Sequence, residues 1–349
     1  MAKVSIIMSA YNAAATLGAT LEALPGSSMS DWEAVIVNDA SQDDTGDRLE
    51  AFAARDRRVR VLHNSQNMGL PASLNRAIDA ARGLYLARLD ADDISLPDRL
   101  ALQCAYLDAH PAVGALGMGA YVIDGVGRLR SYKAPLPSTI LSWAKIWRVP
   151  FIHPTVMLRR DVLEAYGLRY DPTFRLAQDF ELWSRLLDVT EGANLKRPGI
   201  YYRVHGGQST RSKVDLRLDL HRETSRRQLA KIVPGVVSND MMEAQRAFFL
   251  GEAARGAGIP SLQEAVTWRQ AVAEMMLSRH TAEQPVKIGF GLDLWHVFRR
   301  QAGKILGDSF QRQALTAAMP VLVQGRVHMK FWASQRRACV GMEQSVEVC

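Results

Sequence analysis

Three aspartates follow a short apolar run in the segment YLARLDADDIS, residues 85–95. Asp90 and Asp92 are two positions apart, so their side chains point the same way if the backbone is extended. Carboxylates that are brought together repel one another unless a cation lies between them. Oxygen ligands of this kind suit a hard divalent ion such as Mg²⁺ or Mn²⁺, which keeps open positions for phosphate oxygens. The residues also allow a structural interpretation, in which Asp92 or Asp93 caps a helix that begins near Leu96.

The elements that would position these aspartates alternate between strands and helices. Short apolar stretches bounded by turn residues predict strands at residues 4–10, 32–39, 58–64 and 84–90. Helical patterns lie between them, at residues 14–24, 44–55 and 70–82. This alternation is typical of an α/β fold in which helices cover both faces of a parallel sheet.

Ligands of such sheets bind beyond the carboxyl ends of the strands. The predicted strand ends carry polar residues, namely Ser9–Asn12, Asn38–Asp39, His63–Asn64 and Asp90–Asp92. We therefore expect a binding site at this edge of the sheet.

The rest of the chain divides near residue 210. Before that point we expect a helix at residues 96–109, strands at 112–124 and 128–133, a strand entering a helix at 153–160, a helix at 176–189 and a closing segment at 200–210. Residues 1–210 hold 23 Lys and Arg against 23 Asp and Glu. The whole chain holds 43 against 36, so residues 211–349 hold 20 against 13. The sequence thus predicts a first domain at 1–210 and a basic, helix-rich region at 211–349, which would meet something anionic.

Composition narrows the class of protein. A hydrophobic fraction of 48% with 23% charged residues is that of a globular chain rather than a disordered one. Three scattered cysteines make no disulfide framework or metal cluster and fit a reducing compartment. The first apolar run is too short for a signal peptide and closes at Asn12 without a cleavage pattern. No stretch approaches the roughly 18 to 20 apolar residues of a membrane span, so we expect a cytoplasmic protein.

The basic region contains an amphipathic pattern at residues 293–306. Leu294, Val297, Phe298 and Ile305 share one helical face, and the cations Arg299, Arg300 and Lys304 occupy another. Such a helix can lie on an anionic membrane surface, or it can pack on the first domain. No helix-turn-helix, zinc or aromatic-basic RNA signature accompanies the charge, so a nucleic-acid partner is not expected.

Six motifs occur in a characteristic order: VSIIMSAYNA, VIVNDASQDDT, NMGLPASLNRAIDAARGLYLARLDADD, FIHPTVMLRR, AQDFELWSRL and YRVHGGQST. Together they resemble the family 2 glycosyltransferases, inverting enzymes with the nucleotide-sugar-binding GT-A fold. The resemblance covers about residues 3–210. It implies a mixed, mostly parallel central sheet with helices on both faces, followed by a helical C-terminal extension.

The resemblance implies a nucleotide-sugar site made by Ser9, Ala10, Tyr11, Asn12, Asp39, Asn67, Arg88, Asp90 and Ala91. The segment Ser9–Asn12 would line the base and Asp39 would hydrogen-bond it, with Asn38 standing where many relatives have a first aspartate. Two of these residues have other interpretations. Tyr11 could pack in the core rather than stack on the base. Arg88 could pair with the neighbouring carboxylates rather than with a phosphate.

By the same resemblance, Asp90-Ala91-Asp92 would hold a divalent ion, Mg²⁺ or Mn²⁺, together with the diphosphate. Asp92 would be the direct ligand. His205 lies in a glycine-flanked loop that could approach the metal or the diphosphate, or it could be a surface histidine. His153, next to Pro154, could be structural or could take part in the site, and the structural role is favoured.

Asp179 matches the aspartate of the family's Glu-Asp pair, the catalytic base, and Gln178 replaces the glutamate. A general base at this position would take the proton of the acceptor hydroxyl. The position at the start of a helix also predicts a capping role, and a helix N-terminus favours the ionised form. The two roles are compatible.

The expected reaction is transfer of a sugar from a nucleotide-diphosphate sugar, with UDP favoured, to a hydroxyl of a glycan or lipid-linked acceptor. Surface-polysaccharide synthesis at the inner face of the cell membrane would be its setting. A catalytically silent nucleotide-sugar-binding protein is the alternative, and the presence of Asp39, Asp92 and Asp179 together argues against it. A haloacid dehalogenase-type phosphatase would carry its Asp-x-Asp on the first strand. A nucleotidyltransferase would have a glycine-rich basic loop where SAYNAAAT stands.

Overall fold

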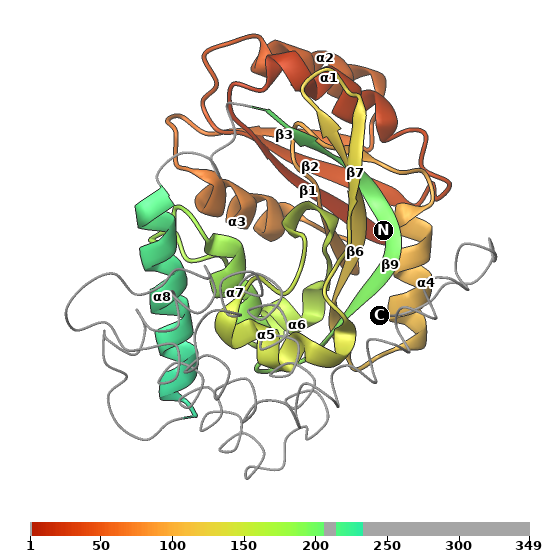
Figure 1. Cartoon of the computed structure of the whole chain (residues 1–349). Helices are drawn as coiled ribbons and strands as arrows, with labels where there is room; N and C mark the ends of the chain where they lie inside the picture. The colour runs from red at the N-terminus through yellow and green to blue at the C-terminus, as the bar shows by residue number, and fades with distance from the viewer. Residues whose placement is uncertain (1, 206–213, 233–349) are drawn as a thin grey trace, which may run out of the picture. The chain divides into compact units, whose positions relative to one another are not determined.

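The computed structural model describes residues 2–205 and 214–232 (Figure 1). The chain divides into two compact units. Within the described residues, the first unit comprises 2–138, 148–205 and 214–221, and the second comprises 139–147 and 222–232. The predicted amphipathic segment at 293–306, with Leu294, Arg299, Arg300 and Lys304, lies outside the described residues, as does most of 211–349.

Four parallel strands form the first part of the sheet, as the sequence predicts. They are β1 (Val4–Ala10), β2 (Trp32–Asn38), β3 (Val59–His63) and β4 (Tyr85–Arg88). Their order is β3-β2-β1-β4, and β1 lies in parallel register with both β2 and β4. The carboxyl ends of all four strands therefore lie at one edge.

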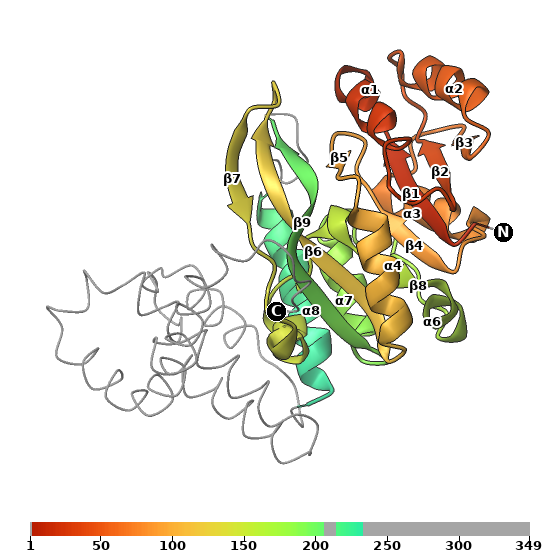
Figure 2. The same ribbon diagram turned by 90° about the vertical axis from the view of Figure 1, so that its right-hand side faces the viewer.

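The second part of the sheet makes it mixed. Antiparallel β8 (Met157–Arg159) joins β4 to β6 (Val113–Asp124), and β6 then pairs in parallel with β9 (Glu191–Val204). β7 (Leu129–Lys133) returns from β6 as a hairpin, and the short β5 (Ile94–Ser95) pairs with β9. Figure 2 shows β6, β7 and β9 grouped on one side and β1, β2 and β3 on the other, in agreement with the strand order. The prediction missed β5, and it did not identify β9 as a strand.

Helices cover both faces of the parallel strands. α1 (Ala14–Ala23), α2 (Thr45–Arg55) and α4 (Arg99–Ala109) add their apolar residues to one core, on the face of β1 that carries Val4, Ile6 and Met8. α3 (Leu70–Ala80) contacts β1 and β2 on the other face as it leads from β3 back to β4 (Figure 1). A right-handed crossover in this direction places the helix on that face. The free Cys104 of α4 is buried in this core.

The remaining elements are short, apart from the last. They are 3₁₀ turns at Ser138–Ile140 and His153–Thr155, and the helices α5 (Leu141–Trp147), α6 (Arg160–Ala165), α7 (Gln178–Leu186) and α8 (Val214–Ala230). The strand predicted at 153–160 is reduced to β8, because Pro154 begins a 3₁₀ turn before it. α7 begins later than predicted because Ala177, with φ 58°, has a left-handed backbone conformation. In the described part of the chain, no helix is both long and apolar enough to cross a membrane.

Candidate active site

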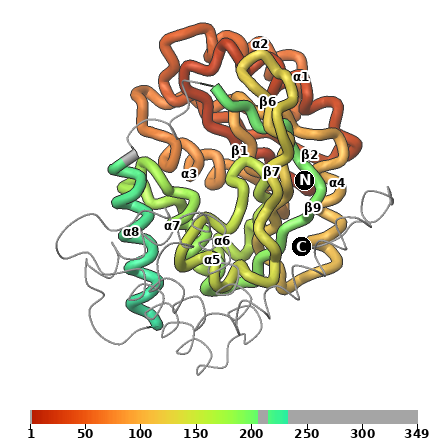
Figure 3. The backbone as a smooth tube through the Cα atoms, viewed as in Figure 1, coloured from red at the N-terminus to blue at the C-terminus, as the bar shows by residue number. Residues whose placement is uncertain are grey.

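An open cleft of about 1080 Å³ lies at the predicted edge of the first unit. Its lining brings together residues that are distant in the sequence. From the predicted set it includes Ser9, Tyr11, Asn12, Asp39, Asn67, Arg88, Asp90, Ala91, Asp92, Asp179 and His205. The tube in Figure 3 shows how β9 returns to this region from the far end of the first unit. Ala10 is the one predicted residue outside the lining, because its side chain is buried in the core.

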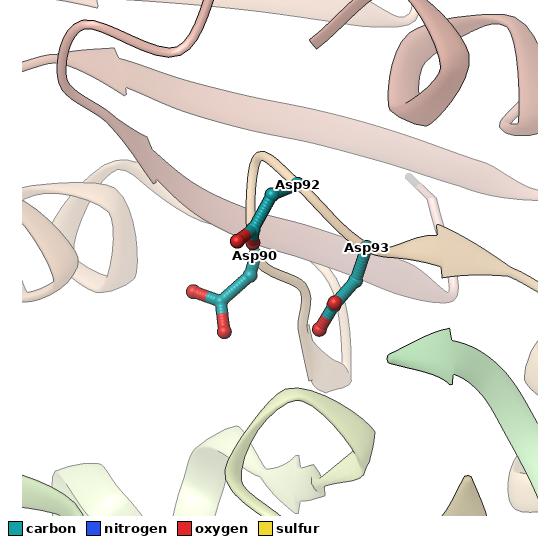
Figure 4. Close-up of side chains that lie close together, drawn as sticks. All are labelled: Asp90, Asp92 and Asp93. Carbon is teal, nitrogen blue, oxygen red and sulfur yellow. The ribbon is translucent and has the colours of Figure 1, made fainter. Parts of the chain in front are cut away.

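The three aspartates lie on the loop that leaves β4, with their carboxylates close together (Figure 4). One oxygen each of Asp90, Asp92 and Asp93 lies within 4.8 Å of the others. Burial raises the pKa of Asp92 above its usual value, the charge of Asp90 adds to this, and the hydrogen bond from His205 opposes it. Burial raises the pKa of Asp93 further, with both other aspartates contributing. Neither alternative capping role is observed, because no side chain caps α4.

The carboxylates are held by basic residues from two directions. The Arg88 guanidinium is almost completely buried and forms an ion pair with Asp90, so in this structure Arg88 contacts a carboxylate. His205 Nε2 lies 3.0 Å from an oxygen of Asp92. Arg203 donates its backbone N–H to Asp93 at 2.8 Å, and its Nε donates to the Asp92 carbonyl at 3.0 Å. β9 therefore fixes the shape of the aspartate loop.

The donor set fits a hard divalent ion. Asp93 Oδ2 is buried and has no hydrogen-bond partner among the described residues, an orphaned acceptor of the kind that a cation would satisfy. Burial is the main cause of the raised pKa values of Asp92 and Asp93, and the negative charge of the neighbouring carboxylates adds to it. Asp93 was missed as a candidate ligand. The sequence predicts only a helix-capping role for its side chain, because residue spacing does not reveal the turn that brings it back to Asp90.

The end of β1 forms the next part of the cleft. Tyr11 is 48% exposed, which excludes core packing as its role. Asn12, with φ 47°, accepts a hydrogen bond from Gln42 N–H at 2.9 Å and donates its own N–H to Ser41 at 3.1 Å. These bonds tie the β1 and β2 loops together beside the cleft.

Asp39, directly after β2, is 2% exposed and accepts three hydrogen bonds. Asn64 Nδ2 donates to it at 2.6 Å, and the backbone N–H groups of Met68 and Gly69 donate at 2.8 and 2.9 Å. The carboxylate therefore holds the loop between β3 and α3, which presents Asn67 to the cleft. Asn64 supports the site from behind, and the sequence identified it only as one of the polar strand ends.

Asp179 is the second residue of α7 and is half-buried at the cleft. Its Oδ1 accepts the Phe180 N–H at 2.8 Å, so a local bond in the first turn of α7 and a position in the cleft coexist. The charge of Asp179 also acts on neighbouring cations. Burial lowers the pKa of Lys133 and of His221, and Asp179 opposes that shift in both. Both residues line the cleft and were missed by the sequence analysis.

Two residues close to the site are held in structural contacts. Glu181, the carboxylate nearest to Asp179 in sequence, is buried in a two-bond ion pair with Arg185 at 2.7 and 2.6 Å. His153 lies 2.9 Å from the Tyr170 hydroxyl, and burial, followed by the charge of Arg88, holds its pKa well below the usual value. His153 also lines the cleft and so contributes to its shape.

The mixed sheet, with aspartates in a cleft at its strand ends, agrees with the GT-A fold that the sequence motifs imply. The profile described as "Glycosyl transferase family 2" matches residues 5–167. The chain is 35% identical to the putative glycosyltransferase EpsE of Bacillus subtilis over 188 residues. This alignment covers 53% of this chain and 67% of EpsE. The putative teichuronic acid biosynthesis glycosyltransferase TuaG of the same organism is 31% identical over 185 residues, 53% of this chain and 71% of TuaG. The chain belongs to glycosyltransferase family 2.

Two further similarities agree with this assignment. The amylovoran biosynthesis glycosyltransferase AmsE of Erwinia amylovora is 27% identical over 215 residues, 60% of this chain and 78% of AmsE. Among solved structures, residues 1–349 of S. aureus TarS in complex with UDP-GlcNAc share the fold, with a TM-score of 0.58 and 17% identity over 86% of this chain and 92% of that one. The predicted GT-A fold is confirmed.

Proposed function

We propose that this glycosyltransferase moves a sugar from a UDP-sugar to a hydroxyl of a glycan or lipid-linked acceptor, with inversion at the anomeric carbon. We further propose that it serves cell-surface polysaccharide synthesis. The names of AmsE and TuaG support that setting, since they refer to amylovoran and teichuronic acid biosynthesis. The UDP-GlcNAc bound to TarS supports a UDP-linked donor.

The observation that carries the proposal is the shared cleft. Asp90 and Asp92 of the aspartate cluster come from a part of the chain distant from Asp179, and all three line the same cleft. Sugar transfer needs these two functions side by side. One site must bind a diphosphate leaving group, and another must remove a proton from the acceptor.

In the proposed reaction, the acceptor oxygen attacks the anomeric carbon while the bond from that carbon to the phosphate oxygen breaks. Asp179 accepts the hydroxyl proton, and a single in-line displacement inverts the configuration. Asp92, Asp93 and His205 would hold a Mg²⁺ or Mn²⁺ ion, with Asp90 beside them. When bound, such an ion supplies Lewis-acid stabilisation of negative charge on the leaving diphosphate.

The donor would lie along the strand ends. Tyr11 offers an exposed ring for the base, and Ser9, Asn12 and Asn67 line the cleft near it. Asp39 would meet the base as a further acceptor, since Oδ2 has one bond from Gly69 and a carboxylate oxygen can accept two. Ala10 would act through its backbone, whose carbonyl accepts the Asp39 N–H at 2.9 Å.

The domain division and the setting in the cell are part of the same proposal. Residues 1–210 would be the catalytic domain, and the basic region 211–349 would meet an anionic membrane surface at the cytoplasmic face. An acceptor on a lipid carrier would then be presented at that surface. The excess of cations after residue 210 supports this arrangement.

Replacement of Asp179 by Asn tests the base. Asn keeps the size and can still accept the Phe180 N–H, but it cannot take up a proton. Turnover of a UDP-sugar should fall roughly 10²- to 10⁴-fold, the usual contribution of a general base, while UDP-sugar affinity stays within about twofold. Both quantities are measured on one preparation, by product formation and by calorimetry.

Asp161 provides a matched control. Its Oδ1 accepts the N–H of the next residue, Val162, at 2.8 Å near the start of α6, the same local bond that Asp179 makes. Asp161 is exposed and outside the cleft, so Asp161→Asn should leave turnover unchanged. Near-normal turnover in Asp179→Asn would show that Asp179 is only a cap. UDP-sugar binding without any turnover by the unaltered protein would favour a silent binding protein.

A further inference from the structure

Lys133, the last residue of β7, carries a positive charge into the cleft. Its Nζ lies 5.0 Å from the ring centroid of Tyr202, a cation–π distance. Among the described residues, no carboxylate lies within ion-pair distance of this ammonium group. The cation is therefore available to a ligand.

Lys133 lines the same cleft as Asp90, Asp92 and Asp179. Burial lowers the pKa of Lys133, and the charges of Asp179 and Asp93 oppose that shift, so the ammonium is within electrostatic reach of both. Tyr202 gives the same placement independently. Burial and then the charges of Asp90, Asp93 and Asp92 raise the pKa of its hydroxyl to about 12. Tyr202, whose ring contacts Lys133, also lines the cleft that holds Asp90 and Asp92.

The strand that carries Lys133 is fixed on both sides. Lys133 pairs with Ala120 of β6 in the hairpin. The preceding residue, Tyr132, crosses β6 over Gly119 and donates its hydroxyl proton to the Lys196 carbonyl of β9. A side chain at position 119 would collide with that ring, so the glycine permits the crossing. The hairpin therefore presents Lys133 at a defined place.

Other cations close to the aspartates are already engaged. Arg88 forms its ion pair with Asp90. Arg203 donates to the carbonyl oxygens of Asp92 and Gly125, which places its guanidinium behind the loop. Both therefore already hold the aspartate loop, whereas Lys133 has no ion-pair partner among the described residues.

We propose that Lys133 binds the terminal phosphate of the donor's diphosphate, the one attached to the sugar. This assignment rests on the proposed function. As the bond between the anomeric carbon and the phosphate oxygen breaks, its electron pair remains on that oxygen and the acceptor oxygen bonds to the carbon. The proton of the acceptor goes to Asp179. Lys133 keeps its own protons and offsets the charge left on the phosphate, which strengthens its contact in the transition state.

Replacement of Lys133 by Met tests the contact, because Met keeps the length of the chain and removes the charge. Calorimetry with UDP and UMP, both in the presence of Mn²⁺, separates the terminal phosphate from the rest of the nucleotide. UDP affinity should fall about 10-fold, as expected for a lost charge-assisted contact, and UMP affinity should stay within about twofold. Lys133→Arg should restore most of the UDP affinity, because it restores the cation.

Arg130 is the matched control, since it lies on the same strand, is paired with Asp124, and is outside the cleft. Arg130→Met should leave both affinities unchanged. Equal UDP affinity in Lys133→Met and the unaltered protein would overturn the assignment. If the KM for the acceptor also rose in Lys133→Met, Lys133 would contact the acceptor instead of the phosphate. A general loss of affinity for UMP as well as UDP would indicate a structural role and also overturn it. If the unaltered protein bound no nucleoside diphosphate, the proposed function itself would fail.

Discussion

Asp39 is expected to stabilise the nucleotide side of the cleft before any nucleotide binds. Its carboxylate is buried and accepts bonds from the Asn64 side chain and from the N–H groups of Met68 and Gly69. Replacement by Asn changes one oxygen into an NH₂ group. The amide fits best with its oxygen toward Asn64 and Met68, which leaves NH₂ facing the Gly69 N–H, and two donors cannot bond.

The cost can be worked from these contacts. A hydrogen bond to a charged group is worth roughly 1.5 to 3 kcal/mol, and Asp39→Asn loses one of three. Gly69 is only half-buried, so water replaces part of that bond and the lower value of about 1.5 kcal/mol applies. For a domain of this size, about 2 to 4 °C per kcal/mol gives a decrease in Tm of about 3 to 6 °C.

Thermal unfolding without nucleotide measures the decrease, and amide hydrogen exchange should show lost protection at Met68 and Gly69. Asp31→Asn is the control, because it removes an exposed carboxylate and should change stability by no more than about 0.5 kcal/mol. UDP affinity should also fall in Asp39→Asn, through the displaced Asn67 loop and the lost acceptor. An unchanged Tm with unchanged exchange would refute the reasoning, since the three bonds would then not stabilise the loop.

Two further predictions concern the ion and a buried histidine. Asp92→Ala should abolish the metal-dependent part of UDP binding and leave the fold intact. UDP affinity is measured with Mn²⁺ and with a chelator, and we expect the two values to differ in the unaltered protein and to be equal in the variant. A metal effect that persists in the variant would contradict the assignment. The lowered pKa of His153 keeps it neutral in the folded state, whereas the unfolded chain binds a proton below about pH 6.5, so stability should decrease as the pH falls below that value, by up to about 1.4 kcal/mol per pH unit for this one group. In urea unfolding, His153→Gln should lessen that decrease, and the exposed control His110→Gln should not.

The sequence was sufficient for the parts of the fold that depend on local pattern. β1 to β4 and α1 to α4 follow from apolar stretches and turn residues, and their boundaries agree within a few residues. The failures occur where distant contacts decide the structure. β5 has two residues and exists only because β9 pairs with it, and α5 carries no periodic signal that separates it from a loop.

The candidate site shows the same division. The Asp90–Asp92 spacing and the position of Asp179 are visible in the sequence, so they could be proposed from it. Asp93, Arg203 and Lys133 could not, because each acts through a neighbour more than 60 residues away. The Asn64 contact with Asp39 spans 25 residues and also depends on two loops meeting at one edge. Spacing identifies groups that share a strand end, but only the fold identifies the groups that hold them.

The charges of the cleft connect these residues into one argument. Arg88 neutralises Asp90, but Asp92 and Asp93 remain close together with raised pKa values, so the cluster favours a cation. A divalent ion there would turn the cluster from a site that repels a diphosphate into one that attracts it. The diphosphate would in turn bring negative charge close to Asp179, which must stay ionised to accept a proton. Lys133, within reach of both Asp93 and Asp179, is placed to offset that charge. Binding of the diphosphate should therefore depend on both the metal ion and Lys133. Loss of either one should lower the affinity for UDP more than the affinity for UMP.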